Sequence, residues 1–183
     1  MNVHRTAPAA IRLFERANRG MPRKERIMSE PNYWIIVGSR ENFAITREHG
    51  FTIQGIKSRH RKKAEQMKPE DKLIYYVTGI KGFGAIATVT SDYFEDHTII
   101  WHSGNPKKKD EDYPFRVHIE PDLILPEGTY LPAQEIALGM QYVQKWPAAN
   151  WTLAFQGNVH KIGQQDYELI RSALVDTAAA APA

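Results

Sequence analysis

Apolar positions along the chain gather in short runs that are typical of buried or half-buried strands. Tyr33 to Val37 is a dense apolar run that ends at Gly38-Ser39, and this pattern predicts a buried strand. Lys72 to Thr78 and Phe83 to Thr90 have the same character, and the intervening Gly79 to Gly82 predicts a hairpin. The same reasoning predicts four weaker extended segments, which are Phe51 to Ile56, Thr98 to Trp101, Phe115 to Glu120 and Trp151 to Gln156.

Helical patterns separate these strands. Ser39 is a suitable N-cap for a helix that stops at Gly50, and Ser58 is one for a second helix that ends at Pro69-Glu70-Asp71. Two more helices are predicted over Pro132 to Tyr142 and Gln164 to Asp176. Together the segments predict an α+β fold in which five to six short strands, mixed or antiparallel, form a small open β-barrel with peripheral helices.

The two ends of the chain lack such patterns. Residues 1–30 contain six arginines and one weak apolar patch, Ile11 to Phe14, which cannot form a core element. We expect this extension to be disordered, either as an organellar transit peptide or as a mis-assigned start upstream of a true initiator at Met28, which we favour. Residues 176–183 form an Ala/Pro-rich tail that we also expect to be disordered. We therefore expect a single folded domain over residues 31–175.

Composition narrows the class of protein. The chain has 183 residues, of which 42% are hydrophobic, so it can bury one core. It has no cysteine, which excludes disulfides, thiolate nucleophiles and Cys-ligated zinc, fits a reducing interior and predicts a cytoplasmic protein. No apolar run approaches the roughly 18 residues of a membrane span, so we expect no membrane partner.

The net charge of +3 is modest, but the basic residues are clustered. They precede or begin the second predicted helix, where unpaired N–H groups and the positive end of the helix dipole also favour a bound anion. A solvated charged face is the other interpretation. The predicted phosphate-binding residues are Lys57, Arg59, Arg61, Lys62 and Lys63.

Several stretches, in their order along the chain, carry a family resemblance. They are YWII at 33–36, ENF at 41–43, Gly50-Phe51, MKPEDKLIYYVTG at 67–79, FGAIATVTSDYFED at 83–96, Trp101 and KWPAANWTLAFQGNVHKI at 145–162. From about Tyr33 to Leu174 the chain resembles an EVE domain of the PUA-like superfamily. The resemblance implies a PUA-like pseudo-barrel with a pocket for a nucleobase, often a modified one.

EVE domains are similar to YTH domains, which read methylated adenine in RNA. Carried over onto this sequence, the YTH pocket corresponds to Ser39, Asn42, the Phe51-Thr52 pair and Trp101. Where a YTH domain has tryptophan two residues after the glycine, this chain has Thr52, so one aromatic wall is absent or shifted. A smaller base, such as a methylated or hydroxymethylated cytosine, therefore fits the resemblance better than methyladenine.

The residue types in this chain also suit the binding of a base, independently of the family resemblance. A single-stranded base needs a flat face, which Trp101 and Phe155 offer, although core packing is the alternative for Trp101. Amides that can read a base edge are Asn42, which also suits a capping role, and Gln156, which also suits a plain turn. Tyr75 and Tyr76 face opposite sides of a strand, so only one can reach a pocket, and we choose Tyr76.

Catalytic patterns are sparse. His97 and His102 lie near Asp96, but their spacing matches no metal-ligand pattern. We therefore predict no metal, no cofactor and no catalytic residue, and interpret the chain as a monomeric, non-catalytic module that binds DNA or RNA carrying a modified base. The alternative is a small hydrolase of modified nucleosides like those of the ASCH branch, with Lys57, Thr78 and Glu95 as the available residue types.

Overall fold

The computed structural model of the protein describes residues 30–103 and 111–181. The predicted N-terminal extension, with its alternative start at Met28, lies outside the described residues except for Glu30. Next to one edge of the sheet, β1 (Tyr33–Gly38) pairs in parallel with β3 (Lys72–Val77) and antiparallel with the edge strand β8 (Val159–Ile162). The 3-10 turn η2 (Thr78–Ile80) leads from β3 into its antiparallel neighbour β4 (Gly82–Val89).

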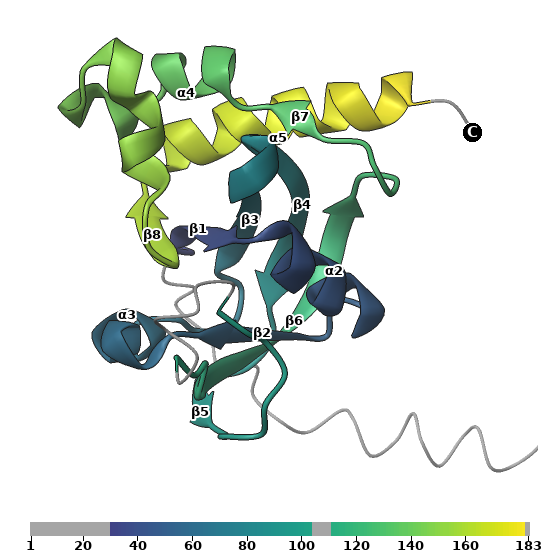
Figure 1. The fold of residues 1–183 in the computed structure, drawn as a ribbon, viewed down its shortest axis with the longest axis vertical. Helices are drawn as coiled ribbons and strands as arrows, with labels where there is room; N and C mark the ends of the chain where they lie inside the picture. The colour runs from purple at the N-terminus through teal and green to yellow at the C-terminus, as the bar shows by residue number, and fades with distance from the viewer. Residues whose placement is uncertain (1–29, 104–110, 182–183) are drawn as a thin grey trace, which may run out of the picture. The chain divides into compact units, whose positions relative to one another are not determined.

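The sheet continues from β4 to β6 (Phe115–Ile124) and β2 (Ile53–Ile56), which gives the order β2-β6-β4-β3-β1-β8. Two short strands lie off this path, because β5 (Phe94–Glu95) pairs with β6 and β7 (Leu131–Pro132) pairs with β4. The mixed sheet curves into a half-barrel with helices around it (Figure 1). The predicted α+β class, a small open barrel of mixed strands with peripheral helices, is therefore confirmed.

Helices lie on both sides of the sheet. In Figure 1, α4 and α5 lie together beyond one end of the central strands, whereas α3, β2 and β5 lie at the other end. The helical segments are α2 (Arg40–Glu48), η1 (Ser58–His60), α3 (Arg61–Ala64), α4 (Gln134–Gly139), η4 (Val143–Lys145), η5 (Ala148–Phe155) and α5 (Gln164–Ala180).

Strand alternation divides the core into two clusters. Ile35, Val37 and Tyr76 pack in one cluster with side chains of α4, η5 and α5. Their sequence neighbours Trp34, Ile36 and Tyr75 pack in the other, with side chains of α2, β2 and β6. Because successive strand residues face opposite sides, β1 and β3 supply both clusters and are buried on both faces.

Two predicted strands are wrong. Trp151 to Gln156 is not extended, because residues 148–155 form η5, and Trp151, Ala154 and Phe155 are buried at the i, i+3, i+4 spacing of a helix. Residues 98–101 pair with no strand among the described residues. The guanidinium of Arg116 instead donates to the Thr98 carbonyl and so holds this segment as a loop.

Three helix boundaries also differ from the prediction. The helix predicted from Ser58 is only the 3-10 turn η1 followed by the four residues of α3, and Pro132 to Tyr142 contains only the six-residue α4. At the C-terminus, α5 runs to Ala180 instead of ending at Asp176. Alanines are strong helix formers, and Ala178 packs against the core, so most of the predicted disordered tail is helical.

Candidate functional site

A small cavity lies beneath α2, between the end of β1 and the loop at Trp101. The residues that line it are Ile36, Val37, Gly38, Asn42, Phe43, Thr46, Gln54, Tyr75, Tyr76, Trp101, Tyr113 and Asn158. The space left for water centres is about 20 Å³, which is room for about one water molecule. A larger ligand can enter only if a wall moves.

Trp101 forms one wall and is itself buried, with 4% of its surface exposed. Its Nε1–H donates to Thr46 Oγ1 at 2.9 Å, and the Arg116 guanidinium lies 5.6 Å from the ring centre. A Cβ on Gly55 would lie 2.4 Å from the indole Cζ3, a distance that no ordinary packing allows. Gly55 therefore lets the indole lie directly against the backbone of β2.

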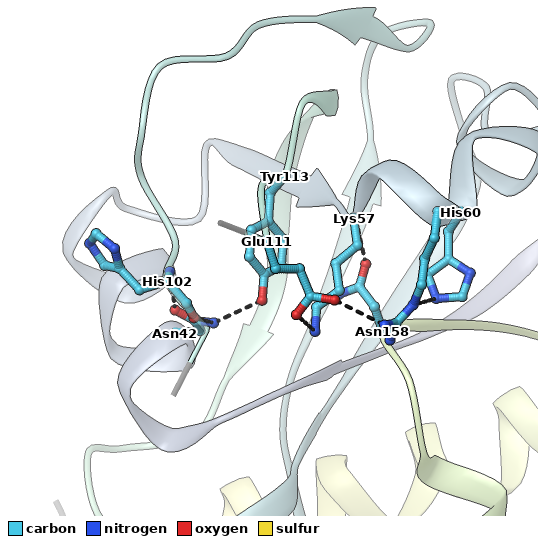
Figure 2. Close-up of polar contacts among 8 residues, drawn as sticks. Asn42, Lys57, His60, His102, Glu111, Tyr113 and Asn158 are labelled. Carbon is cyan, nitrogen blue, oxygen red and sulfur yellow. Dashed lines mark hydrogen bonds and ion pairs between the residues drawn. The ribbon is translucent and has the colours of Figure 1, made fainter. Parts of the chain in front are cut away.

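Asn42 fixes the same loop from α2. Its Nδ2 donates to the His102 carbonyl at 2.7 Å and to the Tyr113 hydroxyl at 3.2 Å, and its Oδ1 accepts from the His102 N–H at 3.1 Å. Figure 2 shows the amide between the loop and Tyr113. The amide that was predicted to read a base edge is thus occupied by the chain in this state.

Two other polar atoms at the cavity are buried and have no hydrogen-bond partner in the described part of the chain. They are Oε1 of Gln54 and the hydroxyl of Tyr75. The Gln54 Nε2 donates to the carbonyl of its neighbour Gly55 at 2.7 Å, which leaves the Oε1 free. Burial also raises the pKa of Tyr75 well above its usual value, so the hydroxyl stays protonated and able to donate.

The structure brings only some of the predicted base-binding residues to the cavity. Asn42, Tyr76 and Trp101 line it, but the ring of Tyr76 stacks on Phe155 with centroids 4.3 Å apart, in the cluster of α4, η5 and α5. The ring of Tyr75 lies in the other cluster with Phe43. Of the two tyrosines, Tyr75 is therefore the one whose side chain lies on the side of Phe43 and α2.

The remaining predicted base contacts lie elsewhere, and none lines the cavity. Ser39 caps α2 by accepting from the Asn42 N–H at 3.2 Å. Phe51 is fully buried in the core, Thr52 donates to the His49 carbonyl, and Gln156 is exposed. Phe51 cannot offer a stacking face, because its ring packs edge-on against Phe43 and Tyr75; Phe155 is likewise 2% exposed and packed.

Sequence reasoning missed Thr46, Gln54 and Tyr113, which line the cavity, and Arg116, which lies over the Trp101 ring. Gln54 lies among apolar residues in a four-residue strand, and a lone polar residue there gives no sign of whether it faces the core or solvent. Arg116 is 2% exposed and bonds Asp96 at 2.8 Å and the Tyr113 carbonyl at 3.2 Å. A buried arginine needs such partners, and only the folded loops reveal them.

The five predicted phosphate-binding residues, here called the basic rim, are partly neutralised. Lys57 and Arg59 both bind Glu111, at 2.7 and 2.9 Å (Figure 2). Arg61 binds Glu65 at 2.9 Å, and Lys63 donates to the Val159 carbonyl at 2.7 Å. Lys62 is exposed. With η1 and α3 so short, side-chain charge rather than a helix dipole makes this surface attractive to anions.

Catalytic alternatives gain no geometric support within residues 30–103 and 111–181. No group of three metal-ligating side chains gathers there. His97 contacts Glu95 at 3.0 Å and Asp112 at 3.3 Å, and hydrogen bonding to these carboxylates raises the pKa of His97. No hydrogen bond or ion pair in the described chain joins Lys57, Thr78 and Glu95, the residue types of the hydrolase alternative.

Comparisons with known proteins identify the family. The EVE domain profile matches residues 32–173. This chain belongs to the EVE domain family. It is 28% identical to a UPF0310 protein of Pyrococcus abyssi and 27% identical to one of Pyrococcus horikoshii, and each match covers 78% of this chain and 99% of the relative.

Solved structures share the fold of this EVE chain at low identity. A YTH domain of mmi1 in complex with RNA is 13% identical, with a TM-score of 0.56 over 79% of this chain and 82% of that one. A hypothetical protein from Leishmania major is 15% identical, with a TM-score of 0.54 over 80% and 96%. Within the described residues, no helix has the length and apolarity to cross a membrane.

Proposed function

We propose that this EVE domain is a non-catalytic module that binds DNA or RNA and holds one base, a modified one, in the cavity beneath α2. The observation that carries the proposal is the pairing of an indole wall with two buried polar atoms, Gln54 Oε1 and the Tyr75 hydroxyl, which have no partner among the described residues. An unpaired buried polar group costs about 1 to 3 kcal/mol. A base edge with one donor and one acceptor satisfies both atoms.

Entry of a base requires the loop that follows Trp101 to move, since the cavity holds about one water. The contacts to be loosened are the two hydrogen bonds between Asn42 and His102, whereas the bond from Trp101 to Thr46 keeps the indole wall in place. Once His102 moves away, the Asn42 amide is free to face the ligand. Stacking on an aromatic side chain is worth about 1 to 3 kcal/mol per base, which offsets these losses.

The likeness to a YTH domain bound to RNA supports the nucleic-acid partner. The basic rim supports it too, because phosphates that flank the bound base need cations. Lys62, Arg61 and Lys63 are the side chains of the rim that Glu111 does not bind in the described structure. Contacts of these side chains with the nucleic-acid backbone set the affinity, whereas the cavity sets the choice of base.

The proposal is tested by calorimetric titration with short single strands that carry modified cytosines or adenines, using Tyr75→Phe as the probe. Because the Tyr75 hydroxyl bonds no described residue, its removal is expected to leave the melting temperature unchanged or higher. Affinity for the preferred strand should fall by about 1 kcal/mol, roughly fivefold, with little change for the unmodified strand.

Tyr76→Phe is the matched comparison: Tyr76 also lines the cavity, but its ring stacks on Phe155 on the other side of β3. It should leave the preference unchanged. If Tyr76→Phe removes the preference and Tyr75→Phe does not, the base binds from the opposite side of the sheet. If no strand binds better than its unmodified counterpart, the proposal is wrong. Incubation with modified nucleosides should release no product detectable by mass spectrometry.

A further inference from the structure

A second polar cluster lies next to the cavity, at the turn before β8. His60 in η1 and His160 in β8 both turn Nε2 toward Gly157, and each atom is 3.8 Å from the position that a Cβ on Gly157 would occupy. Gly157 has a φ of +106°, which residues with side chains rarely adopt, so residue 157 places no side chain against the rings. The next residue, Asn158, lines the cavity.

The ring nitrogens of the pair are only partly satisfied. Arg59 Nε donates to His60 Nε2 at 3.2 Å, so this nitrogen is an acceptor and the ring is neutral. The Tyr142 hydroxyl lies 2.7 Å from His160 Nδ1. Nε2 of His160 is buried and makes no well-formed hydrogen bond in the described chain. A ligand that reaches this nitrogen would supply its missing partner.

Cations surround the two rings. Burial first, and then the charge of Lys63, lower the pKa of His160 to about 4, with a small opposing effect from the Gln156 carbonyl. Burial, Lys63, Arg59, His160 and Lys57 lower the pKa of His60 to about 4. Glu111 binds Lys57 and Arg59, whereas no carboxylate in residues 30–103 and 111–181 pairs with Lys63. Tyr142 stays neutral, because burial raises its pKa.

We propose that His60, His160 and Lys63 form a phosphate-binding subsite that takes up a proton from solvent when the phosphate binds. A phosphate oxygen in this place accepts from Nε2 of His160 and from the Lys63 ammonium. Its negative charge reverses the effect of the surrounding cations and stabilises an imidazolium. This inference rests on the proposed function, since the phosphate next to a base in the cavity is its expected ligand, and free phosphate is the other source.

The subsite is tested by following the histidine Hε1 signals by NMR from about pH 3 to 7, a window that contains the pKa of about 4 of each free histidine. Three samples are compared: protein alone, protein with inorganic phosphate, and protein with an unmodified single-stranded tetranucleotide. We expect the tetranucleotide to raise the apparent pKa of His160, His60 or both by about one unit or more. The unmodified strand is chosen because it reports phosphate contacts without requiring a base in the cavity.

Calorimetry then compares the affinity of the wild type with that of histidine variants as the pH changes. In the wild type, affinity for the tetranucleotide should rise as pH falls, by up to about tenfold per pH unit for each proton taken up. His160→Gln should flatten this dependence, and His60→Gln is the second variant if the first fails to fold. His118→Gln, which replaces an exposed histidine of β6, is the control and should keep the wild-type dependence. Preference for a modified base should survive all three substitutions.

The outcomes separate the two proposals. A tetranucleotide that binds without moving either histidine pKa overturns the subsite and leaves the base cavity standing. A protein that binds no strand at any pH overturns the proposed function, and the inorganic phosphate sample then decides the subsite. A shift with inorganic phosphate alone identifies an anion site for free phosphate and overturns its role toward a nucleic-acid backbone. No shift in either sample overturns the subsite altogether.

Discussion

Trp101 combines two environments that the sequence could not distinguish. Its side chain is 4% exposed, as expected for a core residue, yet it belongs to neither hydrophobic cluster of the described residues and lines the cavity instead. Its orientation depends on polar contacts, with Thr46 bonding the indole N–H and Arg116 lying over the ring. The position of the wall is therefore set by residues that need not touch a ligand.

The first prediction follows from that dependence. Thr46→Val keeps the shape of the side chain but leaves the Trp101 N–H without its acceptor. We expect the free energy of unfolding to fall by about 1 to 3 kcal/mol, because a buried donor loses its partner, and base preference to weaken. Chemical denaturation and calorimetry measure the two effects.

Thr177→Val is the matched control for Thr46→Val. Both threonines donate to the carbonyl four residues earlier in a helix, Thr46 to Asn42 and Thr177 to Ala173, so the helical cost of the substitution is shared. Only Thr46 also accepts from a tryptophan. If the two variants lose equal stability and both keep their preference, the Thr46 bond does not position the wall.

Among the helices and strands, the sequence correctly predicted those whose positions follow from the spacing of apolar residues and from helix caps. β1, β3, β4 and α2 are found where the apolar runs and Ser39 placed them. What failed depends on long-range contacts: η5 was taken for a strand, and β8 was missed because His160 and Lys161 interrupt its apolar pattern. Strand alternation showed that Tyr75 and Tyr76 face opposite ways but not which side faces the cavity.

The close contact between Gly55 of β2 and the Trp101 ring can be tested by substitution. Gly55→Ala places a methyl group 2.4 Å from the Trp101 ring and 2.9 Å from the Tyr113 Cβ. The ring or the strand must shift, which costs about 1 to 3 kcal/mol of stability, and base preference should change with it. Gly79→Ala is the control, since a Cβ there meets nothing within 4 Å. Equal melting temperatures for the two variants would contradict the packing of Trp101 on β2.

At the scale of the whole molecule, charge is arranged so that one acidic residue moderates the basic rim. The chain has a net charge of only +3, and Glu111 alone binds both Lys57 and Arg59. It lies two residues before Tyr113, a wall of the cavity. Substituting Glu111 therefore changes the field at the rim without removing any cation.

Glu111→Gln gives the last prediction. The amide is nearly isosteric with the carboxylate but uncharged, so Lys57 and Arg59 become available to phosphates. Affinity should rise for modified and unmodified strands alike, and the slope of log K against log salt should steepen by about one to two units, as one or two more phosphates are neutralised. Base preference should stay the same, because phosphate contacts do not carry it.

Replacing Arg61 and Lys62 by Ala should change the slope in the opposite direction by a similar amount. A salt slope that neither change alters would mean that nucleic acid does not pass over this rim, and the phosphate contacts would then have to be sought elsewhere on the domain.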